Sequence, residues 1–167
     1  MTHRRIALPS AILAAVGALA LSPGAGQAAD RTQTLRFFEQ RVSLKVTHAD
    51  GTVVANPESA QPQPGDVLEV DSLDYAGNHA HHAKRWTASS HLRCVFGTGE
   101  PTCESHVAIG GSLLIFTGNP ATLAGGTGIY QGATGRVISA KEIKDDGTDV
   151  VAKIRVRASA SAAIAAR

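Results

Sequence analysis

Residues 125–137 read Gly-Gly-Thr-Gly-Ile-Tyr-Gln-Gly-Ala-Thr-Gly-Arg-Val, and this stretch is the strongest indicator of the fold. Its first eight residues include four glycines, which can adopt positive φ and let two strands approach closely at a corner of a sheet. Tyr130 can plug an apolar interior with its ring while keeping one polar tip. The functional alternative is a phosphate-binding loop, but no Lys-Ser or Lys-Thr pair follows and no helix is expected next. The segment therefore predicts a structural turn.

On both sides of this segment, apolar and polar residues alternate with a period of two, as expected for strands with one buried face. In the first strand Val42, Leu44 and Val46 share one face. Gly110-Gly111 predicts a bulge or sharp bend, and Asp146-Gly147 predicts a hairpin. Strands are expected over 32–47, 66–75, 86–96, 102–117, 121–123, 136–144 and 149–157, with a Pro-rich loop over 48–65. Seven or eight such strands predict an all-β barrel or sandwich.

The N-terminus has the pattern of a secretory signal peptide. Arg4 and Arg5 precede an apolar stretch over 6–21, and Gly26-Gln27-Ala28 places small residues at a cleavage site. The stretch is shorter than the roughly 20 apolar residues that a membrane-spanning helix needs, and it contains helix breakers. We expect removal of residues 1–28 and a secreted, extracellular protein, with Sec export favoured over the twin-arginine route.

Cys94 and Cys103 are the two cysteines of the chain. An even number of cysteines in an oxidising compartment favours one intramolecular disulfide, whereas a cytosolic chain would favour two unpaired thiols. Because the pair flanks a predicted hairpin turn, the bridge would fix the register of two strands. It would also consume both thiols, which argues against nucleophilic catalysis by cysteine.

Charge and size limit the partners. After the predicted cleavage point the chain retains 14 of its 16 basic residues and all 14 acidic ones, so its formal charge is zero. A neutral chain without a basic run gives no footprint for nucleic acid or an anionic membrane. The length suits one domain. We expect a signal peptide over 1–28, a barrel domain over 29–158 and a flexible Ala/Ser tail over 159–167.

Three segments resemble the allene oxide cyclase and dirigent-like barrel superfamily, in particular its small secreted actinobacterial members. They are Pro64-Gly65-Asp66-Val67-Leu68, Leu73-Asp74-Tyr75 and, above all, residues 125–137. The resemblance covers residues 31–158. It implies an eight-stranded antiparallel allene oxide cyclase-like β-barrel around an apolar cavity. Plant members are often trimers, so it also implies that this chain can form a homo-oligomer, either dimer or trimer.

The resemblance also suggests an acidic site residue. Plant allene oxide cyclases use an acidic residue on the first strand, and Glu39 falls near the matching place. If Val42, Leu44 and Val46 point inward, however, strict alternation turns Glu39 outward, and a bulge would be needed to bring it into the cavity. Alternation therefore predicts a solvated Glu39 whose replacement by Gln changes little.

Other candidates for the site are aromatic and histidine side chains. Phe38, Trp86 and Tyr130 are candidates for contact with an apolar ligand. His79, His81 and His82 could hold zinc or copper, but a solvated hairpin tip is the favoured interpretation, and we expect no cofactor and no metal. His91 and His106 should form an exposed cross-strand pair.

Three functions remain open. The barrel can be an isomerase, an intramolecular cyclase acting on a small apolar molecule, because such a cavity can fold a flexible molecule into a reactive conformer. It can instead be a dirigent-like or lipocalin-like binding module without catalysis. The third alternative is a structural envelope barrel. A cavity below about 300 Å³ would argue against the first two.

The export hypothesis makes a direct prediction. Protein recovered outside the cell should begin at Ala29 or Asp30, because signal peptidase cleaves after a small residue. Edman sequencing or intact-mass measurement would establish this terminus. Exported protein that still begins at Met1 would contradict the prediction.

Overall fold

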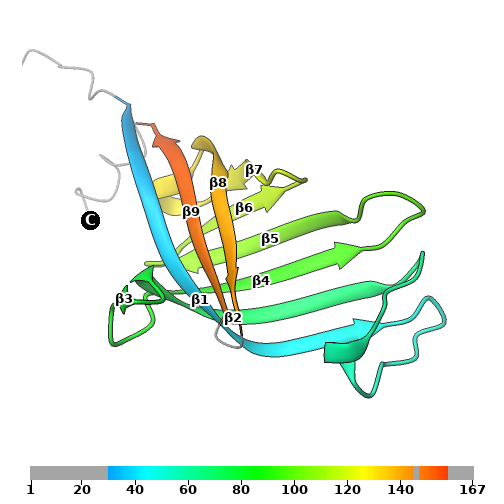
Figure 1. Cartoon of the computed structure of the whole chain (residues 1–167). Helices are drawn as coiled ribbons and strands as arrows, with labels where there is room; N and C mark the ends of the chain where they lie inside the picture. Colours follow the sequence, from blue (N-terminus) through cyan, green and yellow to red (C-terminus); the bar gives the residue numbers. More distant parts are fainter. Residues whose placement is uncertain (1–29, 145–146, 158–167) are drawn as a thin grey trace, which may run out of the picture.

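The computed structural model describes residues 30–144 and 147–157. This part of the chain is built from strands, with two short 3₁₀ turns, η1 (Pro57–Ser59) and η2 (Gly128–Tyr130) (Figure 1). The strands are β1 (Arg31–Thr47), β2 (Val67–Asn78), β3 (His81–His82), β4 (Ala88–Val95), β5 (Thr102–Ile109), β6 (Ser112–Thr117), β7 (Thr122–Gly126), β8 (Thr134–Ile143) and β9 (Gly147–Val156).

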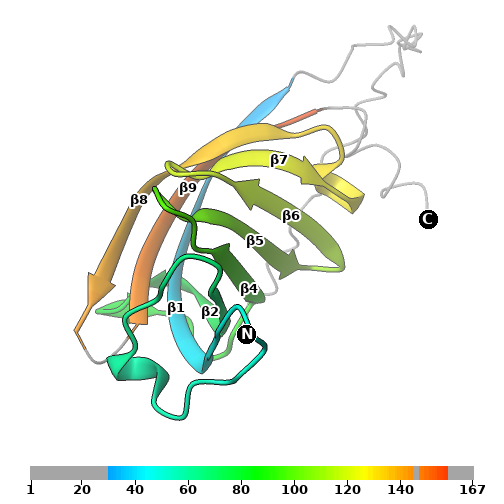
Figure 2. The same cartoon turned by 90° about the vertical axis from the view of Figure 1, so that its right-hand side faces the viewer.

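Eight of these strands form a closed antiparallel barrel, which confirms the predicted fold class. The order of neighbours is β1-β9-β8-β7-β6-β5-β4-β2, and β1 also pairs with β2. Strand β1 closes the barrel because its residues 31–39 pair with β9 while its residues 37–47 pair with β2. Figure 2 shows the resulting curvature. Each of the eight strands has a paired neighbour on both sides, although β7 and β8 pair at Thr122 and Arg136 alone.

Two local features differ from the sequence-based expectation. Gly110 and Gly111 both have positive φ, at 54° and 75°, and form a tight turn between β5 and β6. This conformation suits a two-residue hairpin better than the predicted bend within one strand. The short strand β3 was not predicted, and it pairs with the end of β2 outside the barrel circuit.

The glycine-rich segment has the structural role that its sequence predicts. A Cβ atom at position 126 would lie 2.7 Å from the backbone oxygen of Tyr130, so glycine is required for this close approach. Tyr130 is 3% exposed and belongs to the apolar core. That core fills the end of the barrel where β9 finishes, and its larger members are Phe37, Leu114, Phe116, Tyr130, Ile154 and Val156.

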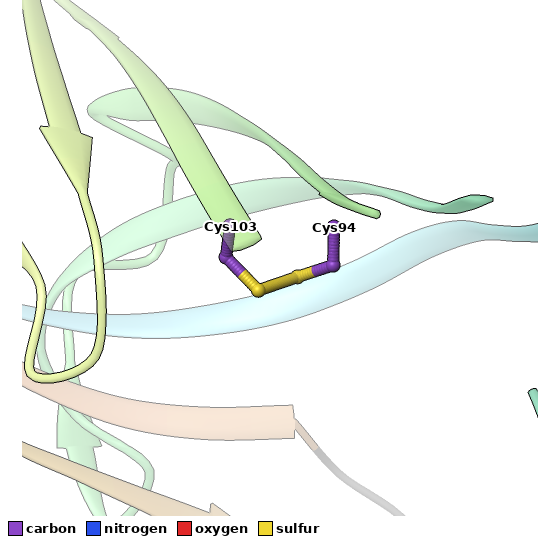
Figure 3. The surroundings of a disulfide bond; sticks show 2 residues. All are labelled: Cys94 and Cys103. Carbon is purple, nitrogen blue, oxygen red and sulfur yellow. A yellow bond between two sulfur atoms is a disulfide. The ribbon is translucent and has the colours of Figure 1, made fainter. Parts of the chain in front are cut away.

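The predicted disulfide is confirmed. Cys94 on β4 and Cys103 on β5 are directly opposite in the register, and their sulfur atoms are bonded (Figure 3). The bridge closes a short loop, with a sequence separation of 9. By the chain-entropy model it stabilises the fold by about 2–3 kcal/mol.

The ends of the chain are outside this description. The predicted signal peptide (1–28) and the predicted tail (159–167) both lie outside the described residues. Within the ranges 30–144 and 147–157, no helix is long and apolar enough to cross a membrane.

Candidate functional site

The barrel contains a cavity of about 450 Å³. This volume lies within the range of about 300–1,000 Å³ that is usual for small-molecule sites. Strands β1, β2, β4, β5, β8 and β9 all contribute inward side chains to its wall. It lies on the side of the apolar core toward the start of β9, where Thr148 and Val150 line it.

The cavity continues into a smaller apolar pocket of about 60 Å³. This inner pocket touches the core, and its apolar wall includes Leu35, Phe37, Val107, Leu114 and Phe116. Residues at the junction line both spaces, and they are Glu39, Ser105, Ala121, Val137 and Val150. Among the described residues that line both the cavity and the inner pocket, Glu39 is therefore the one ionisable side chain.

Glu39 faces the cavity, so the outward orientation expected from strict alternation is wrong. The reason is a register shift in β1 between Arg41, which pairs with Ser72, and Ser43, which pairs with Asp71. Val42 has no partner in that register and is 58% exposed. Because a bulge reverses the side-chain parity, Glu39 faces inward even though Leu44 and Val46 do so as well.

Asp74 is the direct cross-strand partner of Glu39. The two residues are opposite each other in the β1–β2 ladder, and opposite residues project from the same face. Asp74 is 0% exposed, and Ser90 Oγ donates a hydrogen bond of 2.9 Å to its Oδ1. Its Oδ2 has no hydrogen-bond partner among the described residues. A second carboxyl group is thus buried beside Glu39.

Burial raises the pKa of both carboxyl groups. Desolvation, supported by the negative charge of Asp74, raises the pKa of Glu39 to about 8. Desolvation also raises the pKa of Asp74 to about 6, although the hydrogen bond from Ser90 opposes this shift. Between these two values the pair carries one proton and one negative charge, so near neutral pH it can both donate and accept a proton.

The mouth of the cavity is also polar. Gln40, Arg41 and Glu142 line it. The Arg41 guanidinium lies 2.9 Å from Glu58 Oε1, so its charge is compensated by the 3₁₀ turn η1. Arg41 is the one basic side chain that lines the cavity in the described part of the chain.

The three aromatic candidates lie away from the cavity lining, so their predicted ligand contact has no geometric support. Phe38 projects from the opposite face of β1 and packs against Tyr75 and His82, with ring centroids 6.4 Å and 5.2 Å away. Trp86 precedes β4 and is 57% exposed. Tyr130 is buried in the core at the closed end.

The histidine-rich turn does not gather its rings at one point. The Nδ1 atom of His79 lies 2.6 Å from Asp149 Oδ2, whereas His82 packs against Phe38 and Tyr75 and His81 is exposed. Within the described residues, no group of three or more His, Cys, Asp or Glu side chains could hold a metal ion.

His91 and His106 form the exposed cross-strand pair that the sequence predicts. They are opposite each other in the β4–β5 register. Each ring contacts a carboxylate on the exterior, with His91 Nδ1 2.8 Å from Asp71 Oδ1 and His106 Nε2 2.6 Å from Glu104 Oε1. These pairs are solvated and separate from the cavity.

Asp74 is a site residue that was not predicted from the sequence, although the sequence of β2 contains a signal for it. Leu68, Val70, Ser72 and Asp74 share one parity of β2, and the first two are apolar. An acidic residue that continues an apolar face is an anomaly that marks an interior carboxylate. The identity of its neighbour depends on the β1–β2 register, which the sequence alone does not specify.

Comparison with known proteins places the fold. No protein-family model matches the chain, and no curated protein matches it. Among solved structures, pyocyanin demethylase matches with a TM-score of 0.55 at 12% identity, covering 73% of this chain and 99% of that one. A pterocarpan synthase dirigent protein matches with a TM-score of 0.51 at 18% identity, covering 85% and 98%. What is shared is the fold. That shared fold is an eight-stranded antiparallel β-barrel.

Replacement of Glu39 tests its protonation through stability. The folded-state pKa of about 8 exceeds the ordinary value of 4.5, so between these pH values the folded protein keeps a proton that the unfolded chain releases. The free energy of unfolding therefore falls as pH rises through this window. Glu39→Gln has no such ionisable group and removes this pH dependence. Between pH 5 and pH 8.5 the free energy of unfolding of wild type should therefore fall relative to that of Glu39→Gln, by on the order of 2 kcal/mol after allowance for solvent in the cavity.

Thermal denaturation at the two pH values gives the comparison. Glu104→Gln is the matched control, because Glu104 lies on the exterior of β5. The control should follow the wild-type pH dependence. If Glu39→Gln follows it too, Glu39 ionises as it would in water and the inward assignment is contradicted.

Proposed function

We propose that this protein binds a small, largely apolar molecule inside its barrel and holds it in a defined orientation. The single observation that carries the proposal is the cavity of about 450 Å³ with an apolar inner pocket and a carboxyl group at the junction. An apolar wall supplies affinity, while a few fixed polar groups supply orientation. A structural envelope barrel would not need such a space.

The fold supports the same proposal by analogy. Solved structures with a similar fold include a pterocarpan synthase dirigent protein and pyocyanin demethylase, whose names both refer to small molecules. Fold alone does not determine function, so the analogy adds to the geometry and does not replace it. The allene oxide cyclase-like identity implied by residues 125–137 remains part of the proposal.

A second candidate function is isomerisation of the bound molecule by proton transfer. This reaction requires a group in the cavity wall that is protonated near neutral pH. Glu39 has this property because its pKa of about 8 leaves it protonated near neutral pH, with an ionised Asp74 beside it. A protonated acid and a nearby base are the two groups that a proton shift needs. Loss of turnover in Glu39→Gln with binding retained would support catalysis, whereas unchanged turnover would exclude this role.

We also propose that the protein works outside the cytoplasm. The disulfide between Cys94 and Cys103 supports this location, because such bonds form and persist in oxidising compartments. A ligand would then have to be an exported or environmental small molecule.

A cavity-filling substitution tests ligand binding. Val150 lines both the cavity and the inner pocket, so Val150→Phe should occupy the junction and exclude a ligand. We expect at least a tenfold loss of affinity for an apolar fluorescent probe such as 1-anilinonaphthalene or a related neutral dye, with the melting temperature lowered by no more than a few degrees. Fluorescence titration measures the affinity.

The matched control is Val53→Phe, because Val53 is an exposed valine outside the barrel wall. This variant should bind the probe as wild type does. Equal binding by Val150→Phe and Val53→Phe would show that the probe binds elsewhere. Absence of binding by the wild type to a panel of apolar molecules would contradict the proposed function.

A further inference from the structure

The cavity has an excess of acidic groups over basic ones. Glu39 and Glu142 line the cavity, and Asp74, the cross-strand partner of Glu39, is buried behind that lining. Arg41 is the basic residue among the described lining, and it already contacts Glu58 outside the cavity. The lining residues from β4, β5 and β9 are serine, threonine, glycine or apolar. Among the described residues, the wall therefore provides no uncommitted positive charge to balance its carboxylates.

Asp74 shows where the uncompensated negative charge is located. Its side chain is fully buried, and Oδ2 has no hydrogen-bond partner among the described residues. The Ser90 hydroxyl donates its hydrogen bond to Oδ1. A buried carboxylate oxygen without a donor is unfavourable, because desolvation is not repaid by any interaction. A positive charge placed at Glu39 would lie next to this group in the ladder and would stabilise it electrostatically.

We infer that the ligand of this cavity is an organic cation, an apolar molecule that carries a positively charged nitrogen. This inference rests on the proposed binding function and specifies its ligand class. The apolar part of the molecule fits the inner pocket beside Phe37, Leu114 and Phe116. The nitrogen lies at the junction beside Glu39, with Asp74 behind it.

The same arrangement rejects an anion. A ligand carboxylate at the junction would lie against Glu39, with Asp74 behind it, in a partly desolvated site where repulsion between like charges is stronger than in water. Arg41 cannot offset this repulsion without giving up Glu58. A neutral ligand avoids the repulsion but leaves the interior charge unbalanced. The expected order of affinity is cation, then neutral molecule, then anion.

The pH dependence distinguishes a cation from a neutral ligand. Ionisation of Asp74 and then Glu39 adds negative charge to the cavity as pH rises, since their pKa values are raised to about 6 and about 8. Affinity for a permanently charged cation should therefore increase from pH 5 to pH 8.5. A neutral ligand that accepts a hydrogen bond from protonated Glu39 should show the opposite trend. The other charged groups at the cavity are Arg41 on β1 and Glu142 on β8.

Three probes of similar size test the inference on the purified protein. They are (naphthalen-1-ylmethyl)trimethylammonium, its neutral isostere 1-neopentylnaphthalene and the anion 1-naphthaleneacetate. Fluorescence titration at pH 7.5 should give at least tenfold tighter binding for the cation than for the neutral isostere, with the anion weakest. Affinity for the cation should rise at least threefold between pH 5 and pH 8.5.

Variants of Glu39 and Asp74 test whether these two carboxyl groups cause the preference for the cation. Glu39→Gln alone, and together with Asp74→Asn, should reduce the advantage of the cation over the neutral isostere to less than threefold. Glu104→Gln on the exterior should leave that advantage unchanged. If Asp74→Asn impairs folding, Glu39→Gln and the wild-type pH profile still decide the question.

The outcomes separate this inference from the proposed function. If the neutral isostere or the anion binds as tightly as the cation, the inference is overturned while small-molecule binding stands. If the cation binds more tightly but Glu39→Gln keeps the full preference, the charge that selects it lies elsewhere and the inference is also overturned. If none of the three probes binds, both proposals fail.

Discussion

The extra residue at Val42 determines the character of the barrel interior. Strand β1 must serve two partners, β9 along its first half and β2 along its second, and the register shift lies between Arg41 and Ser43. Without that shift, a strand that buries Leu44 and Val46 would turn Glu39 to solvent. With it, Glu39 faces the cavity. One unpaired residue thus converts an aliphatic barrel into one that holds a carboxyl group.

Placing Glu39 beside Asp74 opposes folding. Two neighbouring carboxyl groups in a desolvated wall repel each other when both are ionised, and burial disfavours the charged form of each. Valine or threonine at either position would fit a barrel wall with less cost. The rest of the barrel supplies the compensating stability through the apolar core around Leu114 and Ile154 and the disulfide between β4 and β5. Such local conflict with stability is typical of functional sites.

Much of the fold could be predicted because it depends on local patterns. Period-two alternation locates the long strands, and the glycines at 125–128 indicate a turn. Two cysteines in a chain predicted to be exported indicate the bond between Cys94 and Cys103. The candidate site is harder to predict from the sequence because it depends on how strands β1 and β2 pair. Alternation in β1 gave the wrong orientation for Glu39, since a single-residue bulge leaves no mark in the alternation itself. Its partner Asp74 comes from another strand, so only the register reveals the pair.

The aromatic candidates show a related limit of prediction from sequence, because their burial could be predicted but their position relative to the cavity could not. Phe38 is apolar and close in sequence to Glu39, yet the two side chains project from opposite faces of β1. Tyr130 is buried as predicted, but it fills the closed end of the barrel and does not line the cavity. Size and apolarity predict burial for such residues, whereas contact with a ligand depends on the end and the face of the barrel that they occupy.

The protonation of Glu39 in the ligand-free protein tests this account most directly. Carboxyl-detected ¹³C NMR, with the Glu39 signal assigned by comparison with Glu39→Gln, follows the ionisation of that group alone. The account predicts a midpoint near pH 8, because the bulge at Val42 places the carboxyl group in a desolvated wall beside Asp74. A midpoint near the ordinary value of 4.5 would mean that Glu39 is solvated, and it would contradict the interior carboxyl pair.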